Sequence, residues 1–207
     1  MIFLTSKTKN IFLIITIFIL SLLTTIIIIN KQSLDILLYN HFIKYLINPH
    51  LTTIFKFITN IGGPVSLIIT TIILMFLIKE KKINLSLIIN LLTITIINTI
   101  IKELVKRPRP SGYNIITETG YSFPSGHSMV GLAYFGYLIY LTNKYLSNKY
   151  LKLTITIFLS LLIISIGLSR IYLGVHYASD VIAGFLLSSI YLIIFILITN
   201  KLIKERT

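Results

Sequence analysis

Three short polar segments interrupt an otherwise apolar chain of 207 residues. They span residues 102–110, 124–127 and 169–180 and hold two histidines, His127 and His176, together with Asp180. The same segments supply cations and a serine–glycine pair, namely Lys102, Arg109, Arg170, Ser125 and Gly126. These residue types can bind an anion and can also move protons.

The chemistry that suits this set is phosphoryl transfer. Cations and the free N–H groups at a helix start bind phosphate oxygens. A histidine four residues before an aspartate, as in His176 and Asp180, can be held in one tautomer by that carboxylate. A second histidine, His127, can serve as general acid. The set therefore predicts transfer through a phosphohistidine.

A metal site is the competing interpretation of the two histidines and Asp180. Hard cations take several oxygen ligands, whereas Asp180 stands among three or more positive charges that would repel a metal ion. The chain also has no cysteine, which excludes thiol catalysis and cysteine-based metal sites. We therefore expect neither a metal nor a cofactor.

The composition indicates an integral membrane protein. Hydrophobic residues make up 55% of the chain and charged residues only 12%, against about 25% charged in soluble domains. The net charge of +13 is interpreted as basic residues at anionic membrane faces, because no basic stretch is long enough for a nucleic-acid groove. The expected partners are thus a lipid phosphate substrate and the bilayer, with no nucleic acid and no obligate protein partner.

Six apolar runs predict an all-α fold: one membrane domain, residues 1–207, built as a bundle of six transmembrane helices. Five of the runs cover residues 11–29, 83–101, 125–141, 153–168 and 181–199. The second run in chain order begins after a predicted break at Gly62, Gly63 and Pro64 and ends at residue 78. No small-x-small cleavage site follows the first run, so we expect an uncleaved helix. The first outer loop, residues 30–63, is predicted to carry an interfacial helix around 34–47.

The orientation follows from basic residues near the helix ends. With both termini in the cytoplasm, the cytoplasmic pieces hold 11 of the 19 basic residues and the outer pieces hold 8. This margin favours that orientation under the positive-inside rule. All three polar segments then lie at outer helix ends, so we expect a multi-pass protein of the cell membrane with its site on the outer face.

The pattern K-x6-R-P, P-S-G-H and S-R-x5-H-x3-D resembles the type 2 phosphatidic acid phosphatase family, within the vanadium haloperoxidase-like superfamily. The small six-helix bacterial members are the most similar in the third segment. The resemblance implies a metal-independent lipid phosphatase with His176 as nucleophile, Asp180 as its orienting group and His127 as general acid and base. It also implies a set of phosphate-binding residues: Lys102, Arg109, Ser125, Gly126 and Arg170.

The sequence allows alternatives for some residue roles, for the lipid substrate and for the function. Arg107 also precedes a proline, but the six-residue gap from Lys102 selects Arg109, which leaves Arg107 a supporting role at most. Glu103 and Glu118 are candidate partners of the cationic cluster, but solvation in the loop is the favoured interpretation. The motifs fit undecaprenyl diphosphate, phosphatidylglycerophosphate and phosphatidate equally. The alternatives are a lipid phosphotransferase with the same site and, in another class, a transporter or structural membrane protein.

Overall fold

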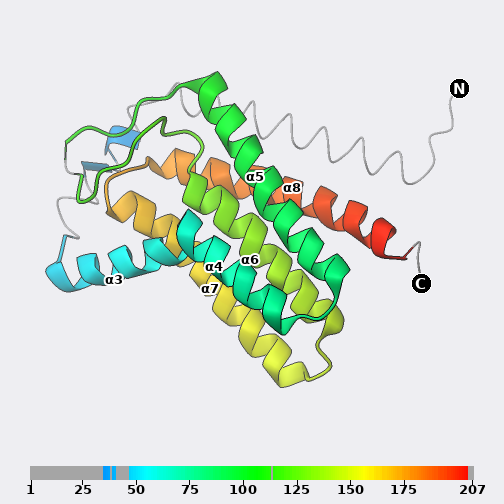
Figure 1. Ribbon diagram of the computed structural model, residues 1–207. Helices are drawn as coiled ribbons and strands as arrows, with labels where there is room; N and C mark the ends of the chain where they lie inside the picture. Colours follow the sequence, from blue (N-terminus) through cyan, green and yellow to red (C-terminus); the bar gives the residue numbers. More distant parts are fainter. Residues whose placement is uncertain (1–34, 38, 41–46, 113, 205–207) are drawn as a thin grey trace, which may run out of the picture.

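The computed structural model describes residues 35–37, 39–40, 47–112 and 114–204, and every regular element within these ranges is an α-helix (Figure 1). The helices are α3 (Pro49–Ile61), α4 (Pro64–Leu77), α5 (Lys81–Val105), α6 (Gly126–Tyr145), α7 (Lys149–Tyr172) and α8 (Ala178–Lys204). Helices α4 to α8 coincide with five of the six predicted runs. The first run, 11–29, and most of the predicted interfacial stretch lie outside the described residues.

Three of these helices are long and apolar enough to cross a membrane, namely α5, α7 and α8. Helices α3 and α4 meet at a bend of 53° and together could form a fourth, broken span. The chain is therefore a multi-pass membrane protein. Six spans, and a helix lying along the bilayer surface, stay predictions.

Helix α6 lies among the other helices and packs against α5, α7 and α8 (Figure 1). Its tyrosines make hydrogen bonds to neighbouring helices: Tyr137 donates to Ser86 at 2.9 Å, and the hydroxyls of Tyr134 and Thr71 pair at 2.9 Å. A helix surrounded by protein can carry such polar groups, because each finds a partner away from lipid. The polar residues of α6 therefore reflect its central place in the bundle.

The break between α3 and α4 is formed by Gly62, Gly63 and Pro64. A Cβ at Gly62 would lie only 2.7 Å from the Cγ2 atom of Ile166 on α7, so the chain passes α7 too closely for any other residue. Pro64 then opens α4, where its missing N–H costs no helical hydrogen bond. The predicted break at these residues is confirmed, and it brings the end of α3 against α7.

The starts of α6 and α8 are joined at the same end of the bundle. The N–H of Ser125 donates to the carbonyl of Asp180 at 3.1 Å. A Cβ at Gly184 would lie 3.0 Å from the carbonyl oxygen of Ser125, so a glycine permits this close approach. The polar segments that open these two helices are consequently held side by side.

Candidate active site

The three polar segments converge on one pocket of about 260 Å³. It lies where α5 and α7 end and α6 begins. Six of the eight predicted site residues line it: Lys102, Arg109, Gly126, His127, Arg170 and His176. The other two, Ser125 and Asp180, are fully buried and do not line it. The structure thus gathers residues that are up to 74 positions apart in the sequence.

His176 lies in the short connection between α7 and α8 and is only 2% exposed. The connection turns at Gly174, whose φ of 75° falls in the region that glycine adopts without strain. Burial lowers the pKa of His176 to about 4, although the nearby carboxylate of Asp180 acts in the opposite direction. The imidazole is therefore neutral at physiological pH and keeps one nitrogen lone pair.

Asp180, in the first turn of α8, is held from several sides. Its Oδ1 atom accepts a hydrogen bond from Arg107 at 2.6 Å. Its Oδ2 atom accepts from the Ser122 hydroxyl at 2.5 Å and from the Tyr177 N–H at 2.9 Å. The same Oδ2 atom lies 3.5 Å from Nδ1 of His176. The carboxylate is thus fixed beside the imidazole.

Arg109 reaches the opposite edge of the same imidazole. Its Nη1 atom lies 3.1 Å from Nε2 of His176 and also donates to the carbonyl of Val175 at 3.0 Å. Hydrogen bonds to the carbonyls of Thr119 and Gly120, at 2.8 and 3.0 Å, hold the rest of the guanidinium. A planar cation fixed in this way can present its N–H groups to a phosphate.

Lys102 and Arg170 place two further cations at the pocket. The Nζ atom of Lys102 donates to the carbonyl of Tyr121 at 2.5 Å. Arg170 is 1% exposed, and its guanidinium donates to the Thr59 hydroxyl of α3 at 2.6 Å and to Glu118 at 2.5 Å. The pocket therefore concentrates positive charge, as an anionic substrate requires.

The expectation that Glu118 is solvated in its loop was wrong. Its carboxylate pairs with Arg170, and its side chain is 30% exposed. Burial alone would raise the pKa of Glu118, but the hydrogen bond and charge of Arg170 lower it overall. The carboxylate therefore stays ionised and orients Arg170.

His127 stands in the first turn of α6, beside Gly126 at the helix start. The first N–H groups of a helix have no partner within it and favour anions. A Cβ at Gly63 would lie 3.7 Å from Nε2 of His127, so the α3–α4 break adjoins this ring. His127 thus faces the pocket from the side of the α3–α4 break.

Arg107 does not line the pocket and has a different environment from Arg109. It is 3% exposed, and its guanidinium bridges Asp180 and Asp35 at 2.6 and 2.7 Å. It also lies 4.3 Å from the ring centre of Tyr177. These contacts agree with a supporting role behind Asp180.

Three partners of the site residues were not predicted from the sequence: Ser122, Thr59 and Asp35, which contact Asp180, Arg170 and Arg107 respectively. Only Ser122 lies near a motif, two residues before Pro124. Thr59 lies in α3, and Asp35 lies in the stretch before it where the sequence shows only an amphipathic pattern. Their contacts span 111 and 72 positions along the chain, so no local signal could identify them.

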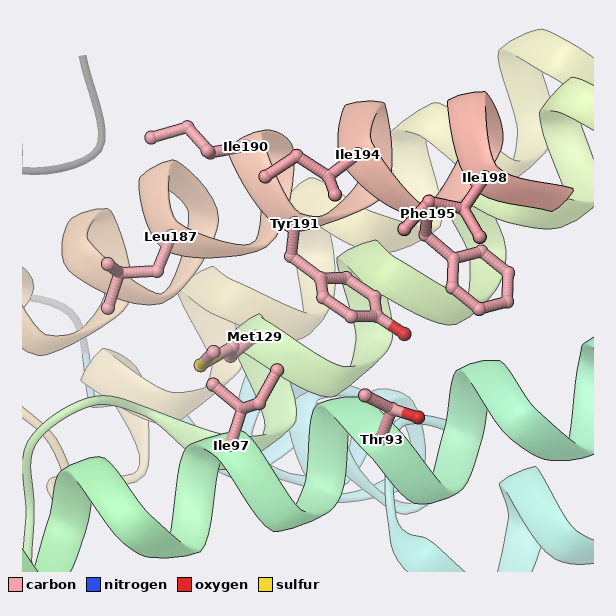
Figure 2. A pocket seen from close by; sticks show the side chains of 9 residues that line it. All are labelled: Thr93, Ile97, Met129, Leu187, Ile190, Tyr191, Ile194, Phe195 and Ile198. Atoms are coloured by element: carbon pink, nitrogen blue, oxygen red, sulfur yellow. The ribbon is translucent and has the colours of Figure 1, made fainter. Parts of the chain in front are cut away.

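A second, larger pocket of about 360 Å³ lies elsewhere, between α5, α6 and α8 (Figure 2). Leucine, isoleucine, methionine and aromatic side chains form nearly all of its lining, with Thr93 at the edge of α5. None of the predicted site residues lines it. The chemistry of the molecule therefore belongs to the smaller, polar pocket.

Comparison with known proteins identifies the family. The PAP2 superfamily matches over residues 83–204. Phosphatidylglycerophosphatase B of Bacillus subtilis is 31% identical over 155 residues, which cover 72% of this chain and 74% of that protein. Sphingosine-1-phosphate phosphatase 1 of Rattus norvegicus is 37% identical over 99 residues, 45% of this chain and 23% of that protein.

Solved structures agree with this assignment. The first transmembrane PAP2-type phosphatidylglycerolphosphate phosphatase from Bacillus subtilis superposes with a TM-score of 0.83 at 26% identity, covering 91% of this chain and 96% of that one. The Aquifex aeolicus LpxE structure shares the fold, with a TM-score of 0.59 at 23% identity over 81% of this chain and 95% of the other. The chain therefore belongs to the PAP2 superfamily, and it is a lipid phosphate phosphatase.

Proposed function

We propose that this enzyme hydrolyses a phosphate monoester of a membrane lipid through a phosphohistidine on His176. The proposal rests on the position of His176. This residue lines the cationic pocket, and its Nε2 atom lies 3.1 Å from Nη1 of Arg109. A neutral imidazole is a nucleophile once its Nε2 lone pair is released from Arg109, and the surrounding cations stabilise a phosphoryl group as its charge shifts.

The reaction has two steps. In the first, Nε2 of His176 bonds to phosphorus, the bond to the lipid oxygen breaks, and His127 gives that oxygen a proton. In the second, His127 takes a proton from a water molecule, the water oxygen attacks phosphorus, and the bond to His176 breaks with release of inorganic phosphate.

The cations bind the phosphate oxygens in both steps. Lys102, Arg109 and Arg170 converge on the pocket from three different segments, and the N–H groups at Gly126 complete the set. In the substrate-free pocket Arg109 contacts the nucleophilic nitrogen itself. When a substrate enters, Arg109 would exchange this contact for a phosphate oxygen, which brings phosphorus opposite the lone pair.

Among the three lipids that the motifs fit, we propose phosphatidylglycerophosphate first. A relative that matches 72% of this chain is named phosphatidylglycerophosphatase B, and the structure that superposes with a TM-score of 0.83 is a phosphatidylglycerolphosphate phosphatase. Sphingosine-1-phosphate phosphatase 1 is also named for a lipid monophosphate. Phosphate release from phosphatidylglycerophosphate, phosphatidate and undecaprenyl diphosphate, each in detergent with the purified enzyme, ranks the candidates directly.

The mechanism is tested with His176→Ala and His127→Ala. In His176→Ala the rate of phosphate release should fall by several orders of magnitude, because the covalent bond to phosphorus cannot form. The thermal unfolding midpoint of this variant should match the wild type. His127→Ala is assayed with p-nitrophenyl phosphate, whose leaving group needs no general acid. It should release about one nitrophenol per enzyme and then stop, because the phosphohistidine is no longer hydrolysed.

Two results would contradict the mechanism. One is a folded His176→Ala enzyme that keeps more than about a tenth of the wild-type turnover. The other is steady turnover by His127→Ala with no burst. An enzyme quenched in alkali during the burst should carry phosphate on His176, detectable by mass spectrometry of its peptides.

A further inference from the structure

Ser122 occupies the gap between His176 and its aspartate. The Nδ1 atom of His176 and the Oδ2 atom of Asp180 are 3.5 Å apart, longer than an ordinary N–H···O hydrogen bond. The Ser122 hydroxyl lies 3.3 Å from that Nδ1 and 2.5 Å from that Oδ2. The serine therefore bridges two groups that do not contact each other closely.

The position of Ser122 is fixed by its surroundings. Its side chain is fully buried, and its N–H donates to the carbonyl of Arg107 at 2.8 Å. The carbonyl of the preceding residue, Tyr121, accepts from Lys102. The segment that carries the serine is thus anchored on both sides, and its hydroxyl cannot turn to solvent.

The two ends of this network determine where the protons lie. An arginine has only donors, so its contact with Arg109 requires Nε2 of His176 to accept. Asp180 is paired with Arg107 and is ionised, so its Oδ2 atom accepts the proton of Ser122. The serine oxygen is then left to accept from Nδ1, which must carry the imidazole proton.

We infer that Ser122 is a positioning residue for the nucleophile, which holds His176 in the Nδ1–H tautomer together with Asp180. This inference rests on the proposed role of His176. The consequence for catalysis is that the Nε2 lone pair points into the pocket. Without the hydroxyl, Nδ1 keeps only the distant carboxylate, and the ring must tilt or exchange its proton to find a partner.

The test compares Ser122→Ala with Ser86→Ala. Ser86 is a matched control, because it is also a buried serine with two hydrogen-bond partners, but it lies near the start of α5, whereas the site lies at the end of that helix, and it does not line the pocket. Ser122→Ala should lower kcat by about 10-fold to 100-fold, as the loss of a hydrogen bond to a charged group does. Its KM and its inhibition by vanadate should match the wild type, because Ser122 does not line the pocket. Ser86→Ala should keep the wild-type kcat.

A direct readout is the tautomer of His176 from ¹⁵N spectra of histidine-labelled enzyme in detergent, with the His176 signals identified by their absence in His176→Ala. The wild type should show a protonated Nδ1 and a bare Nε2. Ser122→Ala should show a mixture of tautomers, and Ser122→Thr, which restores a hydroxyl, should recover the wild-type pattern and most of kcat.

Two outcomes would overturn the inference. One is a Ser122→Ala enzyme that keeps the wild-type tautomer and more than half of kcat. The other is a wild-type spectrum in which Nε2 carries the proton. Failure of the proposed function looks different: His176→Ala would then remain active, while the tautomer of the resting enzyme would still report on Ser122.

Discussion

Replacing Arg107 by methionine tests how the two neighbouring arginines divide their roles. Arg107 joins two carboxylates, Asp35 and Asp180, whose side chains are 6% and 0% exposed. Removing one partner of a buried ion pair costs about 3–5 kcal/mol, because the other charge stays buried without compensation. Arg107→Met should therefore lower the free energy of unfolding by about this amount.

The second variant in this series adds Asp35→Asn to Arg107→Met. The double variant leaves one uncompensated carboxylate in place of two, so it should regain about half of the lost stability. The free energy of unfolding is measured by denaturant titration in mixed micelles. In the folded fraction of each variant, kcat should fall while KM for the lipid phosphate stays unchanged, because Arg107 does not line the pocket.

Arg109→Met is the matched control for this series. Arg109 lines the pocket and contacts His176, so its loss should raise KM and weaken vanadate inhibition with a smaller effect on unfolding. One result would contradict this division of roles: an Arg107→Met enzyme whose free energy of unfolding stays within about 1 kcal/mol of the wild type and which no longer binds vanadate. Arg107 would then be a phosphate ligand.

Three further predictions concern ionisation, inhibition and orientation. Because burial lowers the pKa of His176 to about 4, its ¹⁵N signals should titrate near pH 4, and on the acidic side activity should fall as the pH approaches that value; a ¹⁵N midpoint of 6.5 or above contradicts this. Activity should survive EDTA and be blocked by vanadate, which mimics the five-coordinate transition state; loss in EDTA that Mg²⁺ restores would show a metal requirement. In intact cells, an impermeant maleimide should label Ser111→Cys and spare Ser147→Cys, both at exposed positions of the cysteine-free chain; the reverse pattern would place the site in the cytoplasm.

The helices could be predicted from sequence because lipid requires long apolar runs. The five predicted runs within the described residues each correspond to a helix. Their ends were predicted less well: α5 and α7 continue past the apolar runs and carry Lys102 and Arg170 on their last turns. Polar residues at a helix end are lost from a hydropathy pattern although they remain helical.

The chemical groups of the site could also be predicted, since histidines and arginines at fixed spacings are conspicuous in an apolar chain. Their partners could not. The hydroxyls of Thr59 and Ser122 look the same in sequence whether they face water or, as here, an arginine and an aspartate. The position of Arg107 was equally ambiguous, because only the folded chain brings Asp35 and Asp180 to its two sides.

The hydrogen bond between Thr59 and Arg170 has a consequence for how this enzyme can be dissected or inhibited. The family match begins at residue 83, but Arg170, a proposed phosphate-binding residue, is held by a helix that precedes it. A shortened enzyme built on the matched region alone would retain every motif and lose this support. For the same reason, we expect a ligand that draws α3 away from α7 to loosen Arg170 and lower activity without entering the pocket. Such an allosteric inhibitor would not have to compete with the lipid substrate.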